Sequence, residues 1–323
     1  MPRLRRAVVA LVPVLLIPVL VACGTKTGYG DPEISGFDAL SVTGPVGSKP
    51  ALKWKAVLSY PKAIDATTLV HGSGATVSTD GKGAMASLYI GDGSTKSAEW
   101  AYSSAQPEMI SASMGDVFKK LLDGAKVGDR RAAIATSADV FGPNGAAQYQ
   151  VGNHDAIVVV ADIVADATPK DVPASQLPKL EQKGGKPSGF DFSGIAKPAA
   201  DGPLLRAVVK QGTGTAVTSD MTVTANYLGM TYGAKQVFDE SYSKKAVAFP
   251  LANVVPGWQT GLEGLKVGSR VLLQVPPALG YGAKAQKPNA TGHAPIPANS
   301  TLYFVIDIVS AKKTPASQSS TGQ

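Results

Sequence analysis

The stretch that decides the fold covers residues 254–282 and begins Val-Val-Pro-Gly-Trp-Gln-Thr-Gly-Leu-Glu-Gly-Leu-Lys-Val-Gly. Pro256 suits the first turn of a helix, where its missing N–H removes no hydrogen bond. Trp258 and Leu262 lie one helical turn apart, and Gly264 follows as a stop signal. We therefore expect a helix of two to three turns whose apolar face carries a large aromatic ring.

A strand with one clearly apolar face is predicted directly after this helix. Val271, Leu273 and Val275 alternate with Arg270, Leu272 and Gln274, which is the period of an extended chain. Working outward, the stretch ends in Gly-Tyr-Gly at residues 280–282. The local pattern is thus a single short helix packed on a sheet.

Several motifs occur in an order that resembles one known family. They are Phe238-Asp239, Val254-Val255-Pro256-Gly257-Trp258, Leu265-Lys266-Val267-Gly268 and Gly280-Tyr281-Gly282. Residues 199–313 resemble an FKBP-type peptidyl-prolyl isomerase, a family of immunophilins that bind macrolide immunosuppressants. The resemblance implies an α+β fold in which a twisted antiparallel β-sheet wraps on one short α-helix.

The composition is that of a packed globular protein large enough for two domains. The 323 residues carry a formal charge of +7, of which Arg3, Arg5 and Arg6 supply three. Without them, 28 basic residues face 24 acidic ones, a net charge of +4. No cluster of basic residues is interleaved with aromatics, so nucleic acid is not expected as a partner.

The N-terminal residues are typical of a lipoprotein signal peptide. A basic start precedes an apolar core that is too short to span a bilayer comfortably, and Leu20-Val21-Ala22-Cys23 resembles a bacterial lipobox. We expect a signal peptide at 1–22, a lipidated Cys23, and a tether over 23–34 that leaves the protein membrane-anchored and extracytoplasmic. An uncleaved anchor and a plain secretory leader are the alternatives. Cys23 is the only cysteine, so no disulfide framework is expected.

The chain contains an internal repeat. Residues 122–130 match residues 262–270, and Val160-Ala161-Asp162-Ile163-Val164 matches Val305-Ile306-Asp307-Ile308-Val309. We expect two tandem FKBP-like domains, at 35–168 and 188–313. The Pro- and Gly-containing segment 169–187 is expected to be an extended or mobile linker, and 314–323 a disordered tail.

The resemblance assigns site residues in the second copy. It implies catalytic roles for Asp239 and Tyr281. It implies a substrate-binding surface made of Tyr227, Phe238, Phe249, Val254, Val255, Trp258, Ile296 and Phe304. Taken singly, each aromatic could be an ordinary core residue and Asp239 a solvated turn residue. Together, in order and at these intervals, they favour a site.

This residue set suits isomerisation of X–Pro bonds, which needs no covalent intermediate. The bond turns over a barrier of about 18–20 kcal/mol through a twisted amide that is less polar than the planar one. An apolar site removes the preference of water for the planar form. No metal, nucleotide or nucleophile is required, so no cofactor is expected. The expected partners are proline-containing exported polypeptides, the membrane through Cys23, and macrolide ligands.

The first copy lacks the same residues. Trp100-Ala101 stands for Phe238-Asp239, while Phe118 and Phe141 stand for Trp258 and Tyr281. We interpret it as a degenerate, inactive domain that serves as a spacer or a binding surface. The competing function for the whole chain is a non-catalytic peptide-binding or chaperone lipoprotein that uses the same apolar site. A structural envelope lipoprotein is a third, weaker alternative.

Overall fold

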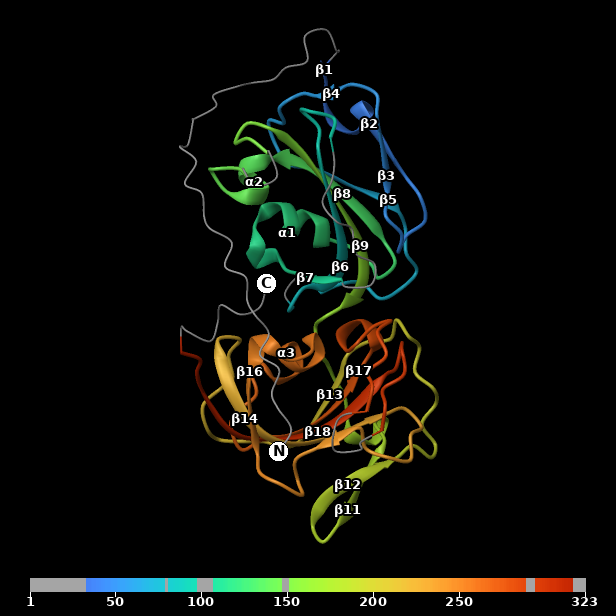
Figure 1. Cartoon of the computed structure of the whole chain (residues 1–323), viewed down its shortest axis with the longest axis vertical. Helices are drawn as coiled ribbons and strands as arrows, with labels where there is room; N and C mark the ends of the chain where they lie inside the picture. The colour runs from blue at the N-terminus through green and yellow to red at the C-terminus, as the bar shows by residue number, and fades with distance from the viewer. Residues whose placement is uncertain (1–32, 79–80, 98–106, 147–150, 289–293, 316–323) are drawn as a thin grey trace, which may run out of the picture.

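The computed structural model describes residues 33–78, 81–97, 107–146, 151–288 and 294–315. Its two large sheets lie one above the other along the long axis of the molecule (Figure 1). The predicted signal peptide, Cys23 and most of the tail lie outside the described residues. Within them, no helix combines the length and the apolar character needed to span a membrane.

The first domain is built on a five-stranded antiparallel sheet in the order β5-β8-β9-β6-β7. Helix α1 packs against the inner face of this sheet, and the short helix α2 follows β8. The bounds of these elements are β5 Asp65–Val70, β6 Ala84–Asp92, β7 Glu108–Ile110, α1 Asp116–Leu122, β8 Arg130–Thr136, α2 Ser137–Phe141 and β9 Ala156–Asp166.

An N-terminal segment covers the outer face of this first sheet. Its hairpin β2–β3 packs with its apolar side chains over Ile134, Val158 and Val160. The bounds are β1 Glu33–Ile34, η1 Gly36–Ala39, β2 Leu40–Thr43, β3 Ala51–Trp54 and β4 Val57–Leu58, and η2 Ala112–Met114 lies before α1. Both faces of the first sheet are therefore buried.

The second domain repeats this order in a seven-stranded sheet. Strands β13-β17-β18-β14-β16 match β5-β8-β9-β6-β7 one for one, with β10 added beside β13 and β15 beside β14. The bounds are β10 Lys170–Asp171, β13 Leu205–Lys210, β14 Met221–Thr231, β15 Asp239–Glu240, β16 Val247–Pro250, η5 Leu251–Asn253, α3 Pro256–Leu262, β17 Arg270–Val275, η6 Pro277–Leu279 and β18 Leu302–Lys313. The two sheets thus share one strand order, which is the arrangement that the internal repeat predicts.

Helix α3 forms where the sequence predicts it and ends for the expected reason. Pro256 occupies the first helical position, and Gly264, just beyond the C-terminus, adopts φ +86°. Trp258 and Leu262 are buried in one cluster with Val271, Leu273 and Val275 of β17, on the inner face of the sheet. Helix α1 is built in a similar way. Its third residue, Phe118, is buried, as is Trp258, the third residue of α3.

The segment 169–187 differs from the expected mobile linker. It supplies β10, the 3₁₀ turn η4 Ala174–Gln176 and the hairpin of β11 Lys179–Lys183 with β12 Lys186–Asp191, and it buries Leu177. The two residues between these strands, Gly184 and Gly185, adopt φ +59° and +77°. Positive φ at both positions is the requirement of a tight hairpin turn, so the glycines shape a turn rather than a mobile connection.

This segment also explains why β17 is buried on both faces. Leu272 and Gln274, expected on an open face, are 4% and 7% exposed. Leu272 belongs to an outer-face cluster with Leu177, Phe190 and Tyr303. The outer face of the second sheet is therefore covered by Leu177 of this segment together with Phe190 at the start of the domain.

The two domains share one apolar cluster. Met85, Ala165 and Ala167 of the first domain are buried in the same cluster as Trp258 and Leu262. The Lys82 ammonium lies 3.3 Å from the Glu263 carboxylate, directly after α3. Helix α3 accordingly lies at the junction of the domains, whereas hairpin β11–β12 lies at the far end of the molecule (Figure 1).

Candidate functional site

Five aromatic rings from five different segments meet on the inner face of the second sheet. Trp258 lies between Tyr227 and Phe304, with ring centroids 5.4 and 5.2 Å away and planes at 82° and 84°. Phe249 contacts Tyr227 and Trp258 at 5.6 and 5.7 Å, and Phe238 contacts Phe304 at 5.6 Å. All five contacts are edge-to-face, the arrangement that aromatic quadrupoles favour. We call these five residues the aromatic cluster.

Strand pairing places these rings together. Gly229 of β14 lies opposite Phe304 of β18 and two residues after Tyr227. A Cβ atom at Gly229 would come within 2.5 Å of the Phe238 ring and 2.8 Å of the Phe304 ring. Only glycine leaves room for both rings at this position.

The Asp239 carboxylate is held at the edge of the aromatic cluster. One oxygen, Oδ2, accepts a hydrogen bond from the Tyr227 hydroxyl at 2.6 Å, and Oδ1 accepts one from the backbone N–H of Glu240 at 3.0 Å. Burial, and then the hydrogen bond to Asp239, raises the pKa of Tyr227, so its hydroxyl stays protonated and donates. A neutral hydroxyl donor therefore helps to orient the half-buried carboxylate.

Sequence reasoning missed Ser241, which fixes the strand that carries Tyr227. Ser241 is 1% exposed, its Oγ accepts from the Tyr227 N–H at 3.0 Å, and its own N–H donates to the Tyr227 carbonyl at 2.9 Å. The sequence signal was limited to its place two residues after Asp239. The contact between Ser241 and Tyr227 depends on how β15 pairs with β14, which the sequence does not specify.

Tyr281 lies at the surface of the same site. It is 39% exposed, and partial burial together with the nearby Asp239 carboxylate raises the pKa of its hydroxyl. Among the described residues, this hydroxyl has no hydrogen-bond partner. It is therefore a free, neutral donor on the Asp239 side of the site.

The remaining predicted residues complete one apolar surface. Ile296 is 6% exposed and pairs through its backbone with Gln286, while Val254 and Val255 pack against the cluster that contains Trp258. In the described part of the chain, the Val255 N–H has no acceptor. The structure thus brings together all ten predicted residues of the second domain, while their individual roles stay predictions.

One buried donor in the aromatic cluster is unsatisfied. The indole N–H of Trp258 has no partner within the described segments, although the side chain is 5% exposed. A buried donor without a partner costs about 1–3 kcal/mol and is uncommon in a purely structural core.

The first domain lacks this constellation at the positions that can be compared. Phe118 and Phe141 are present in or beside its core, but they carry no hydroxyl or indole N–H. The predicted counterparts of Phe238 and Asp239, Trp100 and Ala101, lie outside the described residues. The described residues therefore place one complete site in the chain.

Comparisons with known proteins match the sequence of the second domain. The sequence model of the family described as "FKBP-type peptidyl-prolyl cis-trans isomerase" matches residues 213–309. A probable FK506-binding protein of Corynebacterium glutamicum is 38% identical over 90 residues, which are 28% of this chain and 70% of that protein. The chain belongs to the FKBP-type peptidyl-prolyl cis-trans isomerase family.

Two further similarities concern an isomerase called FkpA. The FkpA of Escherichia coli K12 is 39% identical over 113 residues, or 35% of this chain and 39% of that protein. The crystal structure of Escherichia coli FkpA aligns at 37% identity over 37% of this chain and 52% of that chain, with a TM-score of 0.31. The chain therefore spans about two fifths of the length of this curated relative.

Proposed function

We propose that the second domain catalyses cis–trans isomerisation of X–Pro peptide bonds, with the aromatic cluster as the surface that receives the prolyl ring. The observation that carries the proposal is the Tyr227–Asp239 hydrogen bond of 2.6 Å beside the unsatisfied Trp258 indole. The Asp239 carboxylate and the exposed Tyr281 hydroxyl beside an apolar, aromatic surface support this proposal. Family membership supports the same activity.

The chemistry asked of the site is modest. The barrier of about 18–20 kcal/mol arises from lost amide resonance, and each 1.4 kcal/mol removed, roughly, speeds rotation tenfold. Burying the X–Pro amide among Tyr227, Trp258 and Phe304 removes water, which stabilises the planar, more polar form. Interactions that favour the twisted amide over the planar one then lower the barrier.

The polar groups are suited to hold the peptide while its bond turns. The Val255 N–H and the Tyr281 hydroxyl would donate to substrate carbonyl oxygens on either side of the proline. Asp239 would place its charge beside the twisting carbonyl while Tyr227 fixes its orientation. These roles need no covalent intermediate.

The substrates we propose are exported, proline-containing polypeptides. The N-terminal sequence supports this, because a basic and apolar leader precedes a lipobox-like segment that ends in Cys23. Acylation at Cys23 would anchor the protein at the outer side of a cell membrane. Metabolic labelling with an alkynyl fatty acid tests the anchor, since Cys23→Ala would lose the label.

A protease-coupled isomerisation assay on the full chain tests the activity. We expect acceleration of X–Pro isomerisation, inhibition by a macrolide ligand, and a strong loss of rate in Asp239→Ala. Lys235→Ala, an exposed residue in the turn before Phe238, is the matched control and should retain full activity. If the folded chain binds proline peptides without accelerating their isomerisation, the isomerase proposal is wrong and the chain is a non-catalytic peptide-binding protein.

A further inference from the structure

The two domains carry the same ion pair at the same place. Arg130 lies opposite Asp162 in the β8–β9 register, and Arg270 lies opposite Asp307 in the β17–β18 register. Both guanidinium groups bind their carboxylate through two N–H groups, at 2.6 and 2.7 Å in the first domain and 2.5 and 2.6 Å in the second. The pairs point to the outer faces of their sheets.

In the first domain a backbone turn closes over this pair. The turn 44–48 of hairpin β2–β3 directs three carbonyl oxygens at Arg130, from Gly44, Pro45 and Ser48, at 2.8, 3.0 and 2.9 Å. The Gly47 N–H donates to Asp162 at 2.7 Å. Both side chains are 1% exposed as a result. In the first domain, the remaining hydrogen-bonding groups of the ion pair are thus bonded by the backbone of a polypeptide turn.

Among the described residues of the second domain, no such turn closes over the pair. Arg270 and Asp307 are 27% and 25% exposed. The Tyr242 hydroxyl donates to Asp307 at 3.0 Å, in the role that Gly47 has in the first domain. In the described part of the chain, however, no carbonyl oxygen accepts from Arg270.

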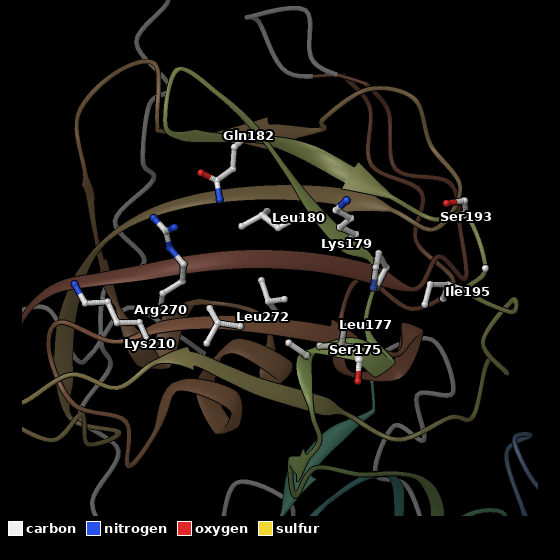
Figure 2. A pocket seen from close by; sticks show the side chains of 14 residues that line it. Ser175, Leu177, Lys179, Leu180, Gln182, Ser193, Ile195, Lys210, Arg270 and Leu272 are labelled. Carbon is white, nitrogen blue, oxygen red and sulfur yellow. The ribbon is translucent and has the colours of Figure 1, made fainter.

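A groove takes the place of the missing turn. A cavity of about 610 Å³ is lined by apolar Leu177, Leu180, Ile195 and Leu272 and by Arg270. A second cavity, of about 390 Å³, lies beside the ion pair and shares Lys210 and Arg270 with the first. Figure 2 shows Lys210 and Arg270 at one end of the larger cavity and Ser193 and Ile195 at the other. We call the surface formed by Leu177, Leu180, Ser193, Ile195, Lys210, Arg270 and Leu272 the outer-face groove.

The basic side chains of the groove favour an occupant that carries negative charge. Lys210 of β13 lies opposite Arg270 of β17 in the strand register. At the equivalent position of the first domain, the residue opposite Arg130 is the uncharged Val70 of β5. Lys179 also lines the larger cavity, and no carboxylate does. The occupant of this groove is therefore expected to carry negative charge that the turn 44–48 does not need.

We propose that the outer-face groove binds a turn of another polypeptide, with its backbone carbonyl oxygens on Arg270 and an acidic side chain at Lys210. This is a second peptide site, because Arg270 and Leu272 alternate along β17 with residues whose side chains face α3 and the aromatic cluster. It does not depend on the proposed isomerase activity. A chain with either site disabled would still show the other.

The chain itself supplies the probe for a test. A backbone-cyclised peptide of residues 42–52, with Pro45 and Pro50 replaced by alanine so that it offers no X–Pro bond, presents the first domain's turn in a preorganised form. A second peptide carries Lys49→Glu. Calorimetric titration of each into the full-length protein should show binding, with the glutamate peptide at least fivefold tighter at low salt and the difference shrinking as salt rises.

Two matched variants separate the contributions. Arg270→Lys keeps the charge next to Asp307 but loses the planar fork, so both peptides should bind at least tenfold more weakly. Lys210→Val restores the first domain's residue and should reduce the preference for the glutamate peptide, because it removes one of the three basic side chains that line the larger cavity. Circular dichroism checks that both variants are folded.

Three outcomes would overturn the proposal. They are absence of binding in the folded wild-type chain, unchanged binding in Arg270→Lys, and binding that appears only on dissociation of a dimer, which would make a second copy the occupant. Isomerisation of a short X–Pro peptide serves as the independent readout. It should be unaffected by saturating cyclic peptide, and Asp239→Ala should leave peptide binding intact.

Discussion

At the scale of single residues, the Tyr227–Asp239 hydrogen bond separates two possible roles of the carboxylate. Asp239→Asn keeps the shape and can still accept from the Tyr227 hydroxyl, but it removes the charge. If the charge acts on the twisted amide, kcat/KM should fall by about tenfold, which corresponds to roughly 1.4 kcal/mol of transition-state stabilisation. The protease-coupled assay measures this change.

Tyr227→Phe is the matched comparison, because it keeps the charge and removes the donor that orients it. We expect a smaller fall of about threefold in kcat/KM, together with a loss of about 1 kcal/mol in the free energy of unfolding. Equal effects of the two variants would show that Asp239 acts by organising the site rather than through its charge.

The buried tyrosines make the second domain sensitive to alkaline pH. Burial raises the pKa of Tyr227, Tyr242 and Tyr303 above the usual value near 10. A raised folded-state pKa gives stability that is present below the unfolded pKa and is lost as pH rises toward the folded one. Above pH 10, roughly, each tyrosine should remove up to about 1.4 kcal/mol of unfolding free energy per pH unit.

Urea unfolding at a series of pH values from 8 to 11, roughly, checks this loss. Tyr303→Phe removes one of the three groups, along with its hydrogen bond to Gln274 at 2.8 Å. It should lower stability at neutral pH but flatten the alkaline decline by about a third. A decline of unchanged slope in this variant would contradict the assignment.

The sequence predicted the identity of the site residues better than their contacts. Trp258, Phe304 and Tyr227 were found because large aromatics stood at intervals typical of one family. Gly229 and Ser241 were not assigned, because their importance depends on which residues face each other across β14, β15 and β18. Register is a tertiary property, and spacing along one strand does not specify it.

At the scale of elements, α3 is held by close approach to the strand after it. Cβ atoms at Gly257 and Gly261 would lie 2.5 Å from Val275 and 2.9 Å from Leu273. Alanine normally stabilises a helix interior by about 1 kcal/mol relative to glycine. Here we expect Gly257→Ala to destabilise the second domain by about 1–3 kcal/mol, because overpacking exceeds the gain in propensity.

A double variant tests this cause. Val275→Ala removes the methyl groups that the new Cβ would meet and by itself opens a cavity. In combination with Gly257→Ala the two losses should be less than additive by about 1 kcal/mol or more in urea unfolding. Strict additivity would mean that a Cβ atom at position 257 does not clash with Val275 of β17.

The segment 169–187 shows where element prediction fails. Proline and glycine are enriched both in mobile connections and in tight turns, so composition does not distinguish them. The deciding contacts are the pairing of β10 with β13 and the burial of Leu177 on the outer face. Both depend on a sheet that forms later in the sequence.

At the scale of the whole molecule, the two domains have one sheet order but cover their outer faces differently. In the first, the turn 44–48 encloses Arg130 and Asp162, whereas in the second Arg270 and Asp307 border a groove. A duplicated fold with one face closed and the other open is a physical reason to expect that the copies no longer share a function. It does not require the first copy to be inert, because its shared cluster with α3 packs against the helix that carries Trp258.

The same comparison predicts an unequal effect of equivalent substitutions on stability. Arg130→Met leaves the Asp162 carboxylate and three turn carbonyls buried without their donor, and breaking a buried pair in this way costs about 3–5 kcal/mol. Arg270→Met leaves Asp307 a quarter exposed and still bonded to Tyr242, so a loss of about 1 kcal/mol or less is expected. Hydrogen-exchange mass spectrometry of both full-length variants resolves the two sheets, and should show faster exchange in β2, β3, β8 and β9 for Arg130→Met alone. Equal destabilisation by both substitutions would mean that Arg270 is already enclosed in solution, which would also remove the physical basis of the outer-face groove.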